Sequence, residues 1–174
     1  MTEYRLIDGG VMRLRDCALI PDSLDNSDWQ GYLAWVAAGG KAAPARTLVE
    51  AQQTQIREID AACAEQIAAG FTSSALGQPY RYPAKLTDQS NLQASVLASL
   101  FPGLAEDWAT PFWCQDAAGT WAYRPHTAAQ IQLVGTDGKD AINACIAQKI
   151  HLEEQLANAQ TLAEVEAITW TPPQ

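Results

Sequence analysis

The sequence lacks the signals of a membrane-spanning or secreted protein. No apolar run in the 174 residues approaches the roughly 20 residues that a transmembrane helix needs. The first residues, MTEYRLIDGG, lack the basic-then-apolar pattern of a signal peptide. No C-x-x-C pair occurs, and a chain of this length buries enough surface to fold without disulfides. We therefore expect a reducing cytoplasm and buried structural thiols at the four cysteines, Cys17, Cys63, Cys114 and Cys145.

Positive charge is also scarce. The chain carries 11 lysines and arginines against 20 acidic residues, which gives a formal net charge of −9. A surface this acidic repels phosphate backbones and anionic lipids, so we expect neither a nucleic acid nor a membrane surface as a partner. Hydrophobic residues at 48% and charged residues at 18% are typical of a globular protein and exclude intrinsic disorder.

Motifs for catalysis and metal binding are missing as well. The two histidines, His126 and His151, have no H-x-x-x-H or H-E-x-x-H spacing. No phosphate-loop or nucleophile-elbow motif occurs; no Ser or Thr follows Lys139 in the segment Gly135-Thr-Asp-Gly138-Lys139. We expect His126 in a loop and His151 in solvent or facing a partner, with a Cys114–His126 pairing left open. The sequence predicts no enzyme activity, no metal and no cofactor.

Charge and composition divide the chain near residue 45. The residues up to 46 have a net charge of about −1, whereas the remainder carries nearly all of the acidic excess. The segment GGKAAPA at 39–45 has the small residues, Gly and Pro of a linker. We predict an N-terminal unit over 1–40, a linker over 41–46 and a second domain over 47–174.

The predicted N-terminal unit is a β-hairpin followed by a short aromatic helix. Strand-like residues at 4–7 and 11–14 surround Asp8-Gly9-Gly10, a typical tight turn, and Pro21-Asp22 then breaks the chain. Asn26 or Ser27 caps a helix over 28–38. Its apolar face is predicted from i, i+4 and i+7 spacing and is widened by two further aromatics, so it comprises Trp29, Leu33 and Val36 with Tyr32 and Trp35. Forty residues form a marginal core, so we expect this unit to dock either on the rest of the chain or on a partner.

The second domain is predicted to be α+β, with two long helices, small antiparallel hairpins and shorter helices. Capping boxes at Thr47-x-x-Glu50 and Thr161-x-x-Glu164 open helices that end near residues 69 and 168. Further helices are expected over 87–100 and 127–157, hairpins over 71–83 and 112–123, and a fold-back at Trp170. Gly135 and Gly138 either break the last long helix or are tolerated at about 1 kcal/mol each; we favour one helix.

Tryptophan is abundant, with six residues in 174. Most are expected to fill the core, but Trp and Tyr are also enriched in binding surfaces, and a carbohydrate platform would use the same residues. Trp113 and Trp121 could pair across the second predicted hairpin. The partner-binding residues that we predict are Trp29, Tyr32, Leu33, Trp35, Val36, Trp113 and Trp121.

Several short motifs follow one another along the chain in a distinctive order and spacing. In the C-terminal part they are IxxAxxxxIAAGF at 59–71, YxY at 80–82, DQSNL at 88–92, TW at 120–121, TAxQI at 127–131 and TLAEVEAI at 161–168. Together these motifs resemble an uncharacterised C-terminal domain of tail-fibre and tail-fibre-assembly proteins of tailed bacteriophages and prophages, except that relatives favour helix formers where this chain has Gly135 to Gly138. The segment DWxxYLAWxAxG at 28–39 is similar to parts of the same proteins.

The resemblance implies a non-catalytic tail-associated protein of the bacterial host cytoplasm or the virion tail, with no catalytic residues to transfer. It favours a tail-fibre assembly chaperone that binds a fibre subunit. The first alternative is a permanent structural subunit of the tail or tail fibre, which could form a homo-oligomer. A more remote alternative is a carbohydrate-active enzyme, which would need two carboxylates about 5–9.5 Å apart.

Overall fold

The computed structural model describes residues 3–173, and within them five helices and seven strands form an α+β fold. The predicted fold class is therefore confirmed. The chain divides into two compact units, residues 1–51 and 52–174, and the division falls in the first turn of a long helix. We call them the N-terminal unit and the C-terminal unit.

The N-terminal unit holds a three-stranded antiparallel sheet of β1 (Tyr4–Ile7), β2 (Gly10–Arg13) and β3 (Ala18–Pro21), followed by α1 (Ser27–Ala37). The hairpin and the helix were predicted. The third strand was not, because Pro21 was interpreted only as a break. Pro21 in fact ends β3, an edge strand, where a residue without an N–H group is tolerated.

Four buried side chains form the core of this unit, and two of them are tyrosines. Tyr4 packs edge-on against Tyr32, with ring centroids 5.1 Å apart, and lies 4.9 Å from the ring of Trp35. Val11 and Ile20 supply the aliphatic part. The helix therefore turns its large rings, at three-residue spacing, toward the sheet.

This burial corrects the predicted face of α1. Leu33 and Val36 are exposed, whereas Tyr32 is buried and Trp29 is half-buried against the same core. Part of the predicted linker is also folded: Ala43 pairs with the first strand, its N–H donating to the carbonyl of Tyr4 at 2.7 Å.

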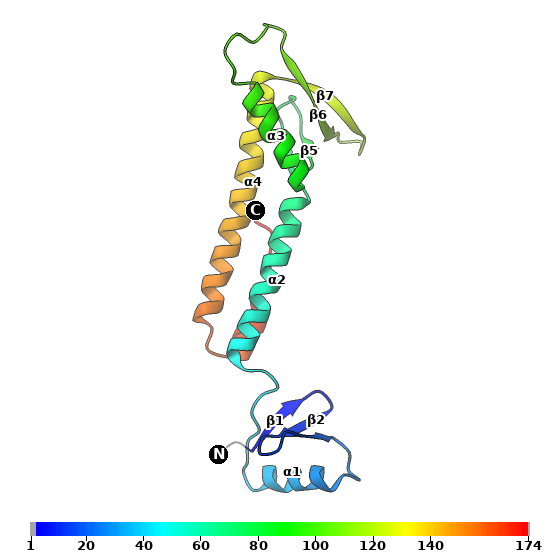
Figure 1. The fold of residues 1–174 in the computed structure, drawn as a ribbon, viewed down its shortest axis with the longest axis vertical. Coiled ribbons are helices and arrows are strands. Elements are labelled where there is room, and N and C mark those ends of the chain that lie inside the picture. Colours follow the sequence, from blue (N-terminus) through cyan, green and yellow to red (C-terminus); the bar gives the residue numbers. More distant parts are fainter. Residues whose placement is uncertain (1–2, 174) are drawn as a thin grey trace. The chain divides into compact units, whose positions relative to one another are not determined.

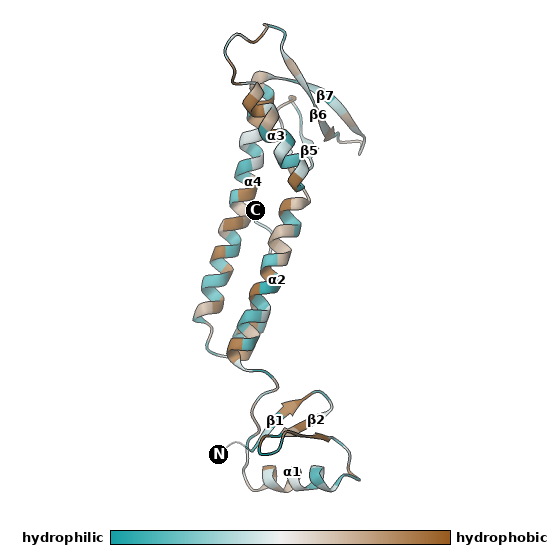
Figure 2. Ribbon diagram, viewed as in Figure 1, coloured by the Kyte–Doolittle hydropathy of each residue, from teal (hydrophilic) through white to brown (hydrophobic). Residues whose placement is uncertain are grey.

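Two long antiparallel helices form the body of the C-terminal unit, α2 (Leu48–Ala68) and α4 (Ala128–Asn158) (Figure 1). The predicted capping box is present, since the N–H of Thr47 donates to the Glu50 carboxylate at 2.7 Å. Contacts fix the antiparallel register: Gln52 donates to the carbonyl of Leu156, and Cys63 to that of Cys145. Figure 2 shows hydrophobic and hydrophilic residues alternating along α4, as expected for a helix with one buried face.

The helix α4 is continuous through both glycines, as we favoured. A β-carbon at Gly138 would lie 2.7 Å from Cζ of Phe71, and one at Gly135 would lie 2.8 Å from Cγ2 of Val96. The two glycines are therefore notches that let a strand and a neighbouring helix approach the axis of α4. Close packing explains residues that helix propensity alone disfavours.

A four-stranded antiparallel sheet covers one end of the helices, in the order β4 (Phe71–Ser73), β5 (Tyr80–Tyr82), β6 (Ala109–Gln115) and β7 (Trp121–Thr127). Both predicted hairpins are confirmed, the second with longer strands. A single residue pair, Arg81 with Gln115, joins the two hairpins. The inner side chains of the sheet form a core with α4, which comprises Phe71, Tyr82, Phe112, Cys114, Ile131 and Val134.

Two short helices and the C-terminal tail complete this unit. Helix α3 (Leu86–Ala98) packs beside α4, and α5 (Leu162–Ala167) starts at the predicted Thr161 capping box. The tail folds back as predicted: Trp170 is half-buried, and Gln148 of α4 donates to the hydroxyl of Thr171 at 3.0 Å.

Candidate functional site

The outer face of the β6–β7 hairpin carries three aromatic side chains, Trp113, Trp121 and Tyr123. Successive strand residues point to opposite faces, so Phe112 and Cys114 are buried while Trp113 lies outside. Trp113 is directly opposite Tyr123 and stacks diagonally on Trp121, with ring centroids 6.1 Å apart and planes 14° apart. The predicted pairing of the two tryptophans is confirmed. Tyr123 is 70% exposed and Trp113 38% exposed, so this aromatic face is accessible in the unit.

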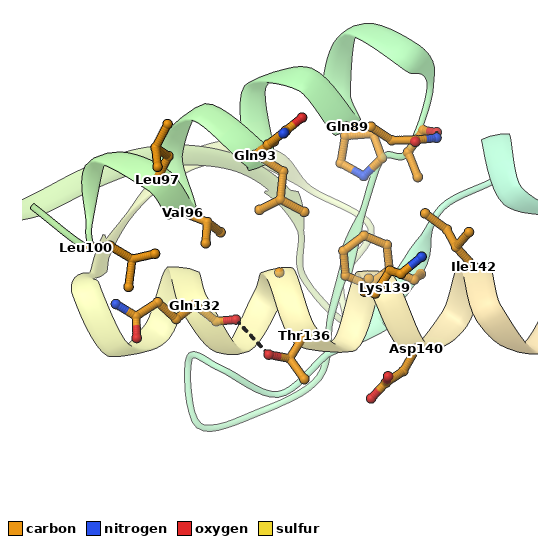
Figure 3. A pocket seen from close by; sticks show the side chains of 16 residues that line it. Gln89, Gln93, Val96, Leu97, Leu100, Gln132, Thr136, Lys139, Asp140 and Ile142 are labelled. Atoms are coloured by element: carbon orange, nitrogen blue, oxygen red, sulfur yellow. Dashed lines mark hydrogen bonds between the residues drawn. The ribbon is translucent and has the colours of Figure 1, made fainter.

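A groove of about 680 Å³ runs between α3 and α4, and we call it the helix groove (Figure 3). Val96 of α3 and Leu100, just beyond the end of that helix, point toward α4. The hydroxyl of Thr136 donates to the carbonyl of Gln132 one turn earlier. Gly135 and Gly138 also line the groove, but Val96 and Phe71 fill the space directly above them. The α3 side of the groove combines the apolar side chains of Leu92, Val96 and Leu97 with the amides of Gln89 and Gln93.

Large apolar side chains remain exposed where α3 ends. Leu100 is 62% exposed and Phe101 is 59% exposed, and Leu97, one turn earlier, is also exposed. Leu97 and Leu100 line the helix groove, so the exposed cluster continues into it. A concentration of exposed apolar side chains next to a groove is characteristic of a protein-binding surface.

The buried histidine of the C-terminal unit is hydrogen-bonded at both ring nitrogens. His126, predicted in a loop, is instead a fully buried residue of β7. Its Nδ1 lies 2.8 Å from the carbonyl oxygen of Arg124 and its Nε2 lies 2.9 Å from the hydroxyl of Tyr82. A carbonyl can only accept, so Nδ1 carries the proton, and the Tyr82 hydroxyl donates to a neutral imidazole.

Burial sets the ionisation of this cluster. It lowers the pKa of His126 below its ordinary value and raises the pKa of Tyr82. Both imidazole nitrogens are occupied by groups other than a thiol, so the structure does not support the Cys114–His126 pairing that the sequence left open. Nearby, Arg124 donates to Asp116 at 2.7 Å and to the carbonyl of Cys114. We assign this cluster a structural role.

The thiols largely follow the prediction. Cys63, Cys114 and Cys145 are buried, and burial raises the pKa of Cys63 and Cys145, which keeps them protonated. Cys17 is a correction, because it is exposed in a turn at φ 55°. His151 lies in solvent on α4, hydrogen-bonded to Gln155.

Between residues 3 and 173, no group of three or more His, Cys, Asp or Glu side chains is arranged to hold a metal ion. In the same part of the chain, no helix combines the length and apolar character needed to cross a bilayer.

The predicted partner-binding residues fall into three settings. Trp29, Tyr32 and Trp35 belong to the core of the N-terminal unit, while Leu33 and Val36 project from that unit. Trp113 and Trp121 lie together on the aromatic face. Two exposed aromatic residues were not among the predicted binding residues. A strict alternation along 121–127 would have indicated Tyr123, whereas Phe101 follows the end of a helix and carries no periodic signal.

Fold and surface together define an α+β protein of two units, one of which presents an aromatic sheet face and an apolar helix groove. The model of the family described as "Domain of unknown function (DUF4376)" matches residues 50–169. The chain therefore belongs to this family, and the match covers most of the C-terminal unit. No curated protein and no solved structure matches the chain significantly.

Proposed function

We propose that this chain is a non-catalytic protein of a bacteriophage or prophage tail, acting as an assembly chaperone that binds a tail-fibre subunit. The observation that carries the proposal is the apolar cluster at the end of α3, continuous with the helix groove. The motifs that resemble tail-fibre and tail-fibre-assembly proteins support the identity of the partner.

The proposed mechanism is temporary coverage of an apolar segment of the fibre subunit. Leu97, Leu100 and Phe101 supply apolar area, and the groove behind them supplies shape. The net charge of −9 keeps the complex soluble and repels other copies of it. Trimerisation of the subunit then displaces the chaperone, because the trimer interface buries the same segment.

Co-expression with a tail-fibre subunit tests this proposal. The wild-type chain is expected to raise the yield of soluble, trimeric fibre, and the variant carrying Leu100→Asp and Phe101→Asp is expected to lose that effect. Leu24→Asp is a matched control, since Leu24 is also highly exposed but lies in the N-terminal unit. An unchanged trimer yield with and without the wild-type chain would reject the chaperone.

A permanent structural subunit is the second candidate, and a different observation favours it. Ile146 and Ile150 are exposed on one side of α4, one turn apart, which would suit packing against another copy of the chain. Mass spectrometry of purified particles separates the two candidates. Fixed stoichiometry in the particle would support the structural subunit, and absence from the particle would support the chaperone.

A further inference from the structure

A second groove, of about 400 Å³, lies between α3 and the β6–β7 hairpin, and we call it the hairpin groove. Trp113 and Tyr123 form its aromatic side, with ring centroids 4.9 Å apart and planes inclined at 56°. The volume is within the range of about 300–1,000 Å³ that is usual for small-molecule sites. The hairpin groove contains none of the apolar residues assigned to the fibre subunit, Leu97, Leu100 and Phe101, and it shares Pro83 with the helix groove.

The aromatic side of the groove is held in place before any ligand arrives. Trp113 stacks on Trp121 of the neighbouring strand. Phe112, the residue before Trp113, is buried in the core. Pro83 and Pro111 also line the groove and have a fixed φ angle. A preformed wall lowers the entropy that binding would otherwise cost.

The opposite side is polar and comes from one face of α3. Asp88, Asn91 and Ser95 follow each other at three- and four-residue spacing, so they line the same side of the helix. One carboxylate oxygen of Asp88 accepts the N–H of Lys85 at 3.1 Å. Within the described residues, the side chains of Asn91 and Ser95 make no hydrogen bond to the protein, which leaves their donors and acceptors for a ligand.

The charge of the lining restricts the ligand. Asp88 is the single ionisable group in the groove other than the Tyr123 phenol, and no lysine, arginine or histidine lines it. A phosphate, sulfate or carboxylate would therefore meet a carboxylate without a compensating cation. The site favours a neutral ligand with an apolar face and several hydroxyl groups.

We propose that the hairpin groove binds a neutral hexopyranose ring. The C–H face of the sugar lies against the π face of Tyr123, the more exposed of the two rings, which attracts the partial positive charge of C–H groups. Trp113, whose plane is inclined to Tyr123 at 56°, contacts the edge of the sugar. Its hydroxyl groups donate to Asp88 and exchange hydrogen bonds with Asn91 and Ser95. This binding activity goes beyond the proposed chaperone function and does not depend on it.

An NMR titration of the full-length chain tests the site. The probes are the methyl β-glycosides of glucose, galactose and N-acetylglucosamine, each raised to about 50 mM, because single sugars bind weakly, with Kd values around 1 mM or above. The indole N–H signal of Trp113, assigned with Trp113→Phe, is expected to shift with at least one of these glycosides and not with methyl glucuronide. Saturation transfer from the protein is expected to reach the protons of one face of the sugar ring.

Two variants and a matched control make the assignment specific. Tyr123→Ala and Asn91→Ala change exposed side chains, so the fold is retained, and each is expected to weaken binding by about ten-fold or more. Gln93→Ala, on α3 but in the helix groove, is expected to leave Kd unchanged within about two-fold. The proposal is overturned if no neutral glycoside shifts the Trp113 signal, if the glucuronide binds as well, or if Tyr123→Ala and Asn91→Ala both bind like the wild type.

Discussion

The N-terminal and C-terminal units bury aromatic rings in different ways. In the N-terminal unit a short helix presses its rings onto a three-stranded sheet, and four buried side chains form the core. In the C-terminal unit a four-stranded sheet packs on a 31-residue helix, and the core includes a buried histidine with both nitrogens bonded. The smaller unit thus packs its large aromatic residues into or against its core, whereas the larger unit has enough other core residues to leave Trp113 and Tyr123 on its surface.

Size explains the difference. A domain of about 50 residues buries a smaller share of its surface than one of about 120 residues, so each large side chain inside it carries more of the stability. An exposed aromatic residue is therefore more informative about binding in the C-terminal unit.

Removing the central ring of the larger core should cost the most. Tyr82 is fully buried against Phe71, Phe112 and His126. Tyr82→Ala is expected to lower the free energy of unfolding of the C-terminal unit by about 3–5 kcal/mol, through a cavity and a lost hydrogen bond. Urea unfolding followed by circular dichroism measures this. Tyr123→Ala is the matched control and should stay within about 0.5 kcal/mol of wild type.

The equivalent deletion in the smaller core should unfold the unit. Ile20 is 1% exposed, and Ile20→Ala is expected to cost about 2–5 kcal/mol, which approaches the whole stability of a unit this small. Limited proteolysis should then cleave residues 1–51 rapidly and leave 52–174 intact. Equal protection of both units in the variant would mean that the N-terminal unit does not depend on its own core. Leu19→Ala, at an exposed neighbour, is the control.

The same substitution should have opposite signs in the two units. Gly138→Ala would place a β-carbon 2.7 Å from the Phe71 ring and is expected to destabilise the C-terminal unit by about 1–3 kcal/mol. Gly31→Ala in α1 meets no atom within 4 Å and is expected to stabilise the N-terminal unit by up to about 1 kcal/mol, through helix propensity. Thermal unfolding of both variants measures the shifts. Stabilisation by Gly138→Ala would show that the notch is not needed.

Acid should weaken the two units in different pH ranges. Burial holds the pKa of His126 below its unfolded value, so the unfolded state binds the extra proton, and stability of the C-terminal unit falls as the pH drops below about 6.5. In the N-terminal unit the bond from Arg13 lowers the pKa of Asp16, so its stability falls only as the pH drops below about 4. Urea midpoints from pH 7.5 to 3.5 measure both. The control His151→Gln should leave the upper range unchanged.

The helices were predictable because their signals are local. Three helices begin at a threonine whose hydroxyl accepts the N–H three residues later, namely Thr47, Thr127 and Thr161. The side chain at that later position accepts the N–H of the threonine in return, and the two bonds fix where each helix begins. Both hairpins of the C-terminal unit could be predicted from Gly-containing turns between strand-like residues. The predicted apolar face of α1 was wrong at Leu33 and Val36, which are exposed. The spacing of apolar residues cannot show which side chains the sheet will cover.

The candidate sites were predictable only in part. Trp113 and Trp121 were identified from their abundance and hairpin position, and alternation along the strands could have added Tyr123. The polar side of the hairpin groove could not be predicted. Asp88, Asn91 and Ser95 line a groove only because the β6–β7 hairpin, which follows later in the chain, packs opposite them. Nor could the close packing of Val96 and Phe71 against Gly135 and Gly138, residues that helix propensity alone disfavours.

Local sequence patterns are enough to predict the class of fold, the start of each long helix and the position of each β-hairpin. These depend on hydrogen bonds and dihedral preferences within a few residues. Packing between distant elements sets which aromatic residues are buried and keeps His126 neutral inside the core. It also lets α4 continue through Gly135 and Gly138, because Val96 and Phe71 pack against them. Such outcomes depend on contacts between residues far apart in the chain, whose energies no local pattern encodes.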